Sequence, residues 1–491
     1  MNSLRTVLLM SRGKRLHVAF REMALDLVRD HRVVVLAAPE YVESFTAAGI
    51  DARPYETGEM SQRRGRYLVA ESSIELDDIS RIERELKLSA HKAASNYVLY
   101  GRIVKSDGGI WSYIETENDV LDTYVRAYRQ LSELFRLIRP DVVFYETIDM
   151  ISSYVAMAMA VREEVFGLEF RFAPLGEGKI MPAYGLERQN PLLEYLNKHP
   201  DEIERSSYLY ADEVLKAVPE HMHRGSYSRL HRNMVHSNAR SLRRRLMGVA
   251  GERERIARGL RNLRWHWNSA RNRRWVERNL ARQLPNRPYI VFFMQYLPEA
   301  SSSSEAPRWV YPGMIVEQLS INAPAFLTIA VKEHPLSYRD GRRGQAFFRP
   351  LQYLPNVYVC HPSVDTSDLI AHAEAIVVVT STVGLEGVLS GKRVAVLGRP
   401  FYSGYGGVRR LDHPADLFPL LDDAAWRPDA MVAERRQFLA AYLQSLQDFG
   451  VGAGTSLYPD TSGANWGRAL RRTADFLDSR GLKPSDFNAG L

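Results

Sequence analysis

The chain of 491 residues is poor in the features that mark several large protein classes. It has one cysteine, Cys360, which excludes a disulfide framework and any metal site built from several cysteines. No apolar run reaches the length of a membrane span, and the apolar stretch near the first residue is too short for a secretory signal. We therefore expect a cytoplasmic protein that does not cross a membrane.

Positive charge is concentrated in one part of the sequence. The net charge of the whole chain is +7. Between Arg224 and Arg287 there are 18 arginines, no lysine and three acidic residues, a local charge of +15. The remainder of the chain then carries about −8. Any interaction with an anionic partner is therefore expected to be local to this segment.

Strand-like and helix-like segments alternate in two separate parts of the sequence. In the first part the β-branched runs are TVLLMS, RVVVLAAP and RPDVVFYE, and in the second they are PYIVFFMQYLPE, LTIAVKEHP, NVYVCHP, AIVVVTS and KRVAVLG. Buried runs of this kind separated by helices are typical of parallel sheets covered on both faces. The sequence predicts an α/β protein with two Rossmann-like halves.

The predicted division has four parts. These are an N-terminal Rossmann-like acceptor domain (1–190), a helical basic insert (191–286), a second Rossmann-like nucleotide-sugar donor domain (287–425) and C-terminal helices (426–491). Two such domains facing a cleft resemble the outline of a GT-B glycosyltransferase. The outline by itself is compatible with many functions.

Polar residues follow the predicted strands of the second half. In open α/β sheets, ligands bind beyond the carboxyl ends of the strands. The residues at these ends are Glu299, Lys332-Glu333-His334, His361, Thr380-Ser381-Thr382 and Arg399. The dipeptide His334-Pro335 alone does not indicate a binding site, because His-Pro occurs four times in the chain, beginning at His199, His334, His361 and His413.

The stretch TSTVGLEGVLSGKRVAVLGRPFYSG is the most informative one. Ser381 or Thr382 is expected to cap a helix whose first N–H groups favour a phosphate. Gly384 would let a ligand approach the backbone, and Glu386 could accept hydrogen bonds from a ribose. The alternative is an ordinary capped helix without a ligand.

VKEHP, followed by TSTVGLEG and GRPFY and preceded by YLPE, resembles the capsule polysaccharide synthesis family over residues 288–410. That family includes bacterial β-Kdo transferases. The resemblance implies that His334 contacts the donor phosphate, that Pro335 fixes the backbone there and that Lys332 adds positive charge. It also implies that Ser381 and Thr382 bind the same phosphate, that Glu386 lies near the ribose, and that no metal or other cofactor is needed. No Asp-x-Asp motif stands in a convincing context.

Transfer at a sugar carbon needs a carboxylate. Glu299 is the leading candidate, as a nucleophile in a retaining reaction or as a base in an inverting one, and Glu305 is a weaker substitute. Glu146, at the end of a strand in the first half, is a candidate acid or base for the acceptor. A solvated or ion-paired carboxylate is the alternative for both Glu299 and Glu146. Tyr402 begins a glycine-rich segment that could form a mobile loop over the donor, and an ordinary surface loop is the alternative.

Tryptophans at 265, 267 and 275 are interspersed among the arginines of the basic insert. Basic helices with tryptophan can lie on an anionic membrane surface. Nucleic-acid binding and a purely structural, solvated face are the alternatives. We expect a membrane surface and no nucleic acid, in part because enzymes of the family that the chain resembles act on lipid-linked glycans at the inner face of the cytoplasmic membrane.

The combined prediction is a glycosyltransferase of capsule or surface polysaccharide synthesis. Its donor would be a nucleotide-activated sugar, CMP-linked and Kdo-like, and its acceptor a glycan or lipid-linked glycan. Two alternatives remain open. One is a UDP-sugar enzyme of the 2-epimerase type, and the other is a non-catalytic nucleotide-binding scaffold of an export complex.

Overall fold

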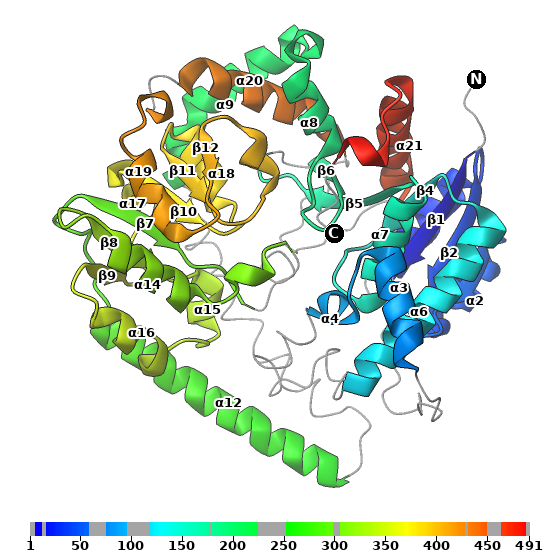
Figure 1. Ribbon diagram of the computed structural model, residues 1–491, viewed down its shortest axis with the longest axis horizontal. Helices are drawn as coiled ribbons and strands as arrows, with labels where there is room; N and C mark the ends of the chain where they lie inside the picture. Colours follow the sequence, from blue (N-terminus) through cyan, green and yellow to red (C-terminus); the bar gives the residue numbers. More distant parts are fainter. Residues whose placement is uncertain are drawn as a thin grey trace.

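The computed structural model describes residues 5–11, 16–57, 75–95, 117–175, 179–223, 252–297, 305–427, 431–448 and 463–487. These residues form two α/β units, which lie on opposite sides of the molecule in Figure 1. Among the described residues, no helix is both long enough and apolar enough to cross a membrane.

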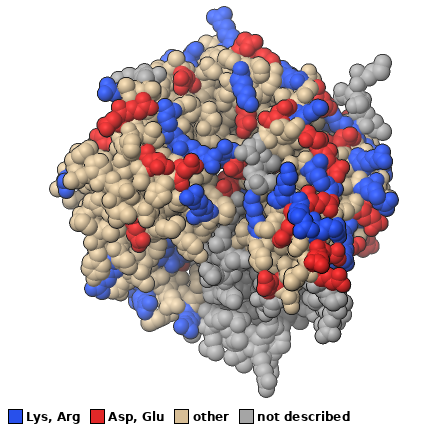
Figure 2. Space-filling model, in the orientation of Figure 1, with Lys and Arg blue, Asp and Glu red and all other residues tan. Residues whose placement is uncertain are grey.

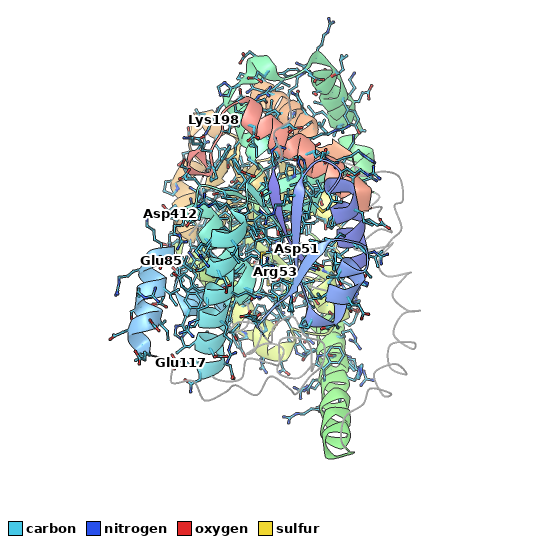
Figure 3. All side chains as sticks on the ribbon, turned by 90° about the vertical axis from the view of Figure 1, so that its right-hand side faces the viewer. Asp51, Arg53, Glu85, Glu117, Lys198 and Asp412 are labelled. Atoms are coloured by element: carbon cyan, nitrogen blue, oxygen red, sulfur yellow. The ribbon has the colours of Figure 1, made fainter. Side chains whose placement is uncertain are left out.

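The first unit is built on a seven-stranded sheet. Its strands lie in the order β13-β6-β5-β4-β1-β2-β3, and β6 and β13 are antiparallel additions to a parallel core. The strand bounds are β1 Thr6–Ser11, β2 Arg32–Ala37, β3 Asp51–Pro54, β4 Val142–Tyr145, β5 Phe166–Phe172, β6 Lys179–Tyr184 and β13 Gln447–Asp448. Figure 3 looks onto the edge strand β3, which Asp51 and Arg53 mark.

Helices cover both faces of this sheet because β1 is apolar on both sides. Val7 and Leu9 belong to one core cluster and Leu8 and Met10 to another, as the alternation of side chains along a strand requires. The helices of this unit are α1 His17–Leu27, α2 Val42–Thr46, α3 Leu76–Leu86, α4 Ala90–Ala93, α6 Glu117–Ile138, α7 Ile151–Arg162 and α21 Gly463–Ser479.

The second unit has a six-stranded sheet in which every pair is parallel. Its order, β12-β11-β10-β7-β8-β9, is the Rossmann order 3-2-1-4-5-6 read from the other edge. The strands are β7 Tyr289–Phe293, β8 Thr328–Lys332, β9 Val357–Cys360, β10 Ala375–Val378, β11 Val394–Val396 and β12 Val408–Arg410. The helices between them are α14 Pro312–Asn322, α15 Pro335–Arg339, α16 Gln345–Gln352, α17 Thr366–His372, α18 Val383–Leu389 and α19 Leu417–Leu420.

The helical segments predicted for 191–286 and 426–491 are not separate units. Helices α8 (Pro191–Lys198), α9 (Arg205–His223) and α20 (Val432–Ser445) pack together and share the core of the second unit. β13 then joins the first sheet, and α21 packs on α1. The chain therefore crosses between the units near Asn190 and again near Ser445, where the Asn190 amide donates to the Ser445 hydroxyl at 2.8 Å.

Helix α12 (Glu252–Asn279) extends away from the body of the molecule in two perpendicular views (Figures 1 and 3). Its C-terminal part packs against α16 and against the segment between α15 and α16. The described 3-10 helices are η1 Pro39–Tyr41, η4 Pro200–Glu202, η5 Pro307–Trp309, η6 Phe401–Gly404, η7 Pro414–Asp416, η8 Ala424–Trp426 and η10 Pro484–Asp486.

Candidate functional site

The strand order of the second sheet reverses between β7 and β10. A reversal of this kind opens a crevice at the carboxyl ends of the two strands, where Rossmann-like folds bind their ligands. His334 follows β8, on one side of β7, and Ser381 follows β10, on the other. Neighbouring strands lie about 4.8 Å apart, so the two residues stem from strands about 10 Å apart. A phosphate group fits between side chains that reach inward from such positions.

His334 is a neutral donor with a fixed tautomer. Its Nδ1 accepts a hydrogen bond from the Leu336 N–H at 3.1 Å and caps α15, while Pro335 occupies the first helical position. Burial, with help from Arg343 and Arg339, lowers the pKa of His334 to about 4. Because Nδ1 accepts, the ring proton is on Nε2, which can donate to a ligand.

The same side-chain cap occurs at three of the four His-Pro sequences, the exception being His199. The Nδ1 atoms of His361 and His413 also accept from the N–H two residues ahead, each at 3.1 Å. Pro414 begins η7, as Pro335 begins α15, whereas Pro362 lies in a turn before α17. His-Pro is thus first a turn-forming cap. His334 differs from the other two because it follows the strand next to the sheet's reversal point.

Lys332 does not face the crevice directly. The side chain is buried, and Nζ donates to the Val364 carbonyl and, at 2.8 Å, to the Thr366 hydroxyl. Burial lowers the pKa of Lys332 to about 8 and raises the pKa of Glu386 to about 7, and the two charges attract each other. The pair lies beneath the strand ends, where Lys332 contributes its charge without exposing its ammonium group.

Ser381 and Thr382 lead into α18. The Ser381 hydroxyl accepts from the Val383 N–H at 3.3 Å, which leaves its proton for another acceptor, and Thr382 is exposed. The N–H groups of Gly384 and Leu385 already bond to the carbonyls of Ser381 and Thr382. The two hydroxyls, rather than these N–H groups, are therefore available to a ligand.

Gly384 and Tyr402 differ from the expectations drawn from the sequence. A Cβ on Gly384 would lie 2.1 Å from the Tyr402 hydroxyl, so the glycine makes room for that ring and not for a ligand. Tyr402 is fully buried and donates to the Ser381 carbonyl. It is therefore no part of a mobile loop. Its hydroxyl fixes the backbone of the residue that begins the α18 turn.

Two arginines that the sequence analysis missed complete this edge. Arg343 donates to Glu333 Oε1 at 2.6 Å and to the Gln295 carbonyl at 3.1 Å, and so joins the ends of β8 and β7. Arg342 donates to the Tyr296 hydroxyl at 3.0 Å. Burial raises the pKa of Glu333, and Arg343 opposes this shift. The local signal was GRRG, in which glycines bracket two arginines.

The crevice also has a second side, in the first unit. Glu146 ends β4, next to the β1–β4 reversal of the first sheet, and is partly buried. Its backbone N–H donates to the Met10 carbonyl at 3.3 Å. Glu299, the other predicted catalytic residue, lies outside the described residues.

A buried ion cluster links the two sheet edges. Arg188 donates to the Thr147 hydroxyl and the Ile148 carbonyl, both at 3.2 Å, at the end of β4. It also lies 3.1 Å from Glu169 in β5 and 3.4 Å from Glu305 in the second unit. The carboxyl edges of the two sheets therefore face each other, which is the GT-B arrangement that the sequence predicted.

The Glu305 carboxylate is part of this ion cluster. Arg171 of β5 approaches it at 3.3 Å, and the side chain is almost fully buried. Burial lowers the pKa of Arg188, whereas the charges of Glu169 and Glu305 raise it by a larger amount. The pKa of the guanidinium group is therefore raised. Glu305, weighed as a substitute catalytic acid, is thus an ion-pair partner between the units. Sequence spacing could not have found the cluster, because its members are up to 136 positions apart.

The residues that the structure describes contain no group of three or more His, Cys, Asp or Glu side chains placed to hold a metal ion. The positive groups near the crevice are arginines and a lysine, and His334 adds a neutral N–H donor. Guanidinium and imidazole N–H groups are suited to a phosphate monoester.

Comparisons with known proteins agree with the resemblance seen in the sequence. Residues 269–443 match the family model described as capsule polysaccharide biosynthesis protein. No curated protein matches the chain significantly. Among solved structures, the β-Kdo 2,4 transferase and β-Kdo 2,7 transferase of Thermosulfurimonas dismutans KpsC are 16% and 13% identical, with TM-scores of 0.37 and 0.36.

These two alignments cover 67% and 70% of this chain and 87% and 90% of the KpsC chains. The calicheamicin glycosyltransferase CalG4 is 14% identical, with a TM-score of 0.27, over 97% of this chain and 98% of its own. The family match is confined to the second unit and includes the whole donor-side edge described above.

Proposed function

Because residues 269–443 match the capsule polysaccharide biosynthesis family, we propose that this GT-B protein is a glycosyltransferase that uses a CMP-activated, Kdo-like sugar. The acceptor is a growing surface glycan or a lipid-linked glycan. The observation that supports this most is the fixed Nε2–H donor of His334 at the reversal point of the second sheet.

The donor phosphate is held between the ends of β8 and β10. His334 donates from Nε2, and the hydroxyls of Ser381 and Thr382 donate from the opposite side. Arg342 and Arg343 supply positive charge from the segment after α15. A nucleoside monophosphate leaves less negative charge to neutralise than a diphosphate does, which suits a site without a metal ion.

Pro335 holds the backbone of the turn at His334. Lys332 acts indirectly, through the attraction between its charge and the Glu386 carboxylate. Glu386 lies one turn into α18, where its carboxyl group can accept hydrogen bonds from the ribose hydroxyls. In this arrangement the sugar points from the second unit toward the first, where the acceptor binds.

Glu299 is the carboxylate that acts at the anomeric carbon. In a retaining reaction it attacks that carbon, and CMP leaves with the bonding electron pair. The acceptor hydroxyl then displaces Glu299 and gives its proton to Glu146. In an inverting reaction a single displacement by the acceptor suffices, and a carboxylate takes the proton.

The first test compares nucleotides by thermal shift. We expect CMP to raise the melting temperature more than UDP or GDP does, because a ligand that binds the native state stabilises it. A larger shift with UDP would overturn the CMP assignment and favour the 2-epimerase type of enzyme.

The second test is Glu299→Gln. We expect turnover to fall at least about 100-fold while the thermal shift with CMP is unchanged, since the variant removes a reacting carboxylate and no phosphate ligand. Unchanged turnover would remove Glu299 from the mechanism. A wild-type protein that binds CMP but transfers no sugar to any capsular acceptor would instead indicate a scaffold.

A further inference from the structure

We propose that one face of α12, continued by α16, is a contact surface for an anionic phospholipid membrane. Five of the exposed residues in the described part of α12 fall at intervals of three and four and therefore on one side of the helix. They are Arg264, Trp267, Arg271, Arg274 and Arg278, while the exposed residues His266, Glu277 and Asn279 lie outside this row. We call this set the arginine stripe.

The opposite face of α12 fixes the orientation of the stripe. Ser269 and Val276 are buried, and the Asn272 amide donates to the Gly341 carbonyl at 2.9 Å. Gly341 and Gly344 lack a Cβ where Ser269 and Asn272 lie against them. The helix is thus held mainly by small and uncharged residues, with one contact from Arg273 to the Arg339 carbonyl, and the arginine stripe faces outward.

A groove between α12 and α16 extends the same surface. Its volume is about 410 Å³, and it is lined by Arg271, Gln345, Ala346, Arg349, Pro350 and Tyr353. The Arg349 guanidinium donates to the Tyr353 hydroxyl at 3.0 Å. Two guanidinium groups facing a groove of this size can accommodate a lipid phosphate.

Aromatic side chains are exposed beside these arginines. Trp267 is 62% exposed and Tyr353 72% exposed, and the guanidinium of Arg271 lies 5.2 Å from the Trp267 ring centre. Exposed tryptophan and tyrosine favour the boundary between lipid headgroups and acyl chains. This combination of charge and aromatic surface matches an anionic bilayer better than a protein partner.

The shape of the surface also favours a membrane over a nucleic acid. The stripe runs along one side of a single helix that extends from the body of the molecule, and Figure 2 shows a row of basic side chains along the lower left edge, over α12. A straight, projecting row can meet a plane along its length. Single-stranded nucleic acid is usually held in a concave basic groove.

The proposed surface uses part of the basic segment between Arg224 and Arg287, because residues 224–251 lie outside the described part of the chain. Of residues 264–279, five are arginines and one is acidic. The acid, Glu277, is itself exposed, and Arg282 and Tyr338 donate to its carboxylate. The one acidic residue beside the arginine stripe in this range therefore has its charge paired by Arg282, outside the stripe.

The experiment is co-sedimentation of the full chain with vesicles of phosphatidylcholine, with and without phosphatidylglycerol. We expect binding that requires phosphatidylglycerol and weakens at high salt. The variant Arg264→Gln/Arg271→Gln/Arg274→Gln should bind about 100-fold more weakly, because each arginine near such a surface contributes about 5-fold. Trp267→Ser alone should reduce binding at high salt, where the aromatic contact accounts for a larger share.

The control variant Arg84→Gln/Arg136→Gln/Arg472→Gln removes the same charge from exposed positions on the first unit. It should sediment like the wild type. Equal losses in both triple variants, binding to phosphatidylcholine alone, or binding to single-stranded RNA but not to vesicles would each overturn the proposal. Sedimentation uses no sugar nucleotide, so these outcomes are independent of the proposed transfer reaction.

Discussion

At the scale of single residues, His334 has two roles that substitution can separate. Its Nδ1 caps α15, and its Nε2–H is proposed to donate to the phosphate. The low pKa of His334 keeps the ring neutral above pH 5, so phosphate binding should not depend on a histidine titration between pH 5 and 8.

We expect His334→Asn to keep the cap, because an asparagine oxygen can accept from the Leu336 N–H, and to lose the donor to phosphate. CMP affinity should fall about 10- to 100-fold, as for the loss of a hydrogen bond to a charged group. His334→Ala should lose the same affinity and about 1 kcal/mol of folding stability in addition. Calorimetric titration and urea unfolding would measure the two effects, and full CMP affinity in either variant would refute the assignment.

Glu386 should make stability depend on pH. Burial raises its pKa to about 7 in the native state, above its unfolded value, so the native state favours the protonated carboxyl group. Its contribution to stability is complete below the unfolded pKa and is lost as the pH rises through about 7. Lys332, which attracts the carboxylate, limits the loss.

Glu386→Gln should therefore be less stable than, or equal to, the wild type at pH 4 and more stable at pH 8, by up to about 3 kcal/mol. Urea unfolding across this pH range checks the sign. As a control, Glu374→Gln makes the same replacement at an exposed position near the start of β10 and should not reverse the order of stability between pH 4 and pH 8. A constant difference between Glu386→Gln and the wild type at all pH values would contradict the expectation.

At the scale of elements, the docking of α12 is tied to the donor-side edge. The segment that joins α15 to α16 carries Arg342 and Arg343 toward the crevice and presents Gly341 to α12. Gly341 has a φ of +61°, and a Cβ there would lie 2.3 Å from the Ser269 carbonyl oxygen. A side chain at this position would force the helix and the segment apart.

Gly341→Ala should lower the free energy of unfolding by about 2–4 kcal/mol, of which about 1 kcal/mol reflects the unfavourable φ and the rest the overlap with α12. It should also weaken CMP binding, since Arg343 is displaced. Gly481→Ala is the matched control, because Gly481 has the same φ of +61° and nothing within 4 Å of the added Cβ. Equal effects of the two substitutions on stability and on CMP binding would show that the contact with α12 is unimportant.

At the scale of the whole molecule, the Arg188 cluster joins the two units. Removing one partner of a buried ion pair leaves an uncompensated charge and costs about 3–5 kcal/mol. Arg188→Met would leave Glu169 and Glu305 buried with fewer partners, and Arg171 is the remaining cation that the structure places on Glu305.

We expect Arg188→Met to lower the free energy of unfolding by about 3–5 kcal/mol at pH 7 and by less at acidic pH, where the carboxyl groups can take up protons. A double-mutant cycle with Glu305→Gln should show coupling above about 1 kcal/mol across the units. Arg129→Met, whose arginine lies 3.6 Å from Asp78 on the surface of the first unit, is the control and should change stability little. Additive effects of Arg188→Met and Glu305→Gln would show that the pair does not hold the units together.

The sequence predicted the two sheets, and it predicted that polar residues gather at the carboxyl ends of their strands. Both predictions were possible because parallel strands are buried, continuous apolar runs that stop at polar residues. The positions of His334, Ser381 and Thr382 at strand ends were predicted in this way, and their role in phosphate binding stays a prediction. The roles of Arg188 and Arg343 were not predictable, because they depend on contacts between segments far apart in the chain. Gly384 was assigned to a ligand because the sequence does not show that Tyr402, 18 positions later, fills the space. The roles of Glu299 and Glu146 remain predictions.

The sequence also did not predict that the C-terminal helices are divided between the two units, because this too depends on contacts between segments far apart in the chain. Their amphipathic patterns do not show which unit each helix covers, and α20 and α21 cover different ones. The comparison adds what the pattern could not, namely that residues 269–443 match the model of a capsule polysaccharide biosynthesis family.

The two chain crossings restrict how the units can move. They lie side by side and are fastened to each other by Asn190 and Ser445, with β13 bonded to β6 next to them. Two neighbouring chain crossings resist twisting of one unit against the other, which a single crossing would allow. The relative motion of the units is therefore a hinge bending about one axis. Opening would then separate Glu305 from Arg188, two residues before the crossing at Asn190, while the sheets keep their alignment, and each closure would return the proposed donor sugar to the same position over the proposed acceptor.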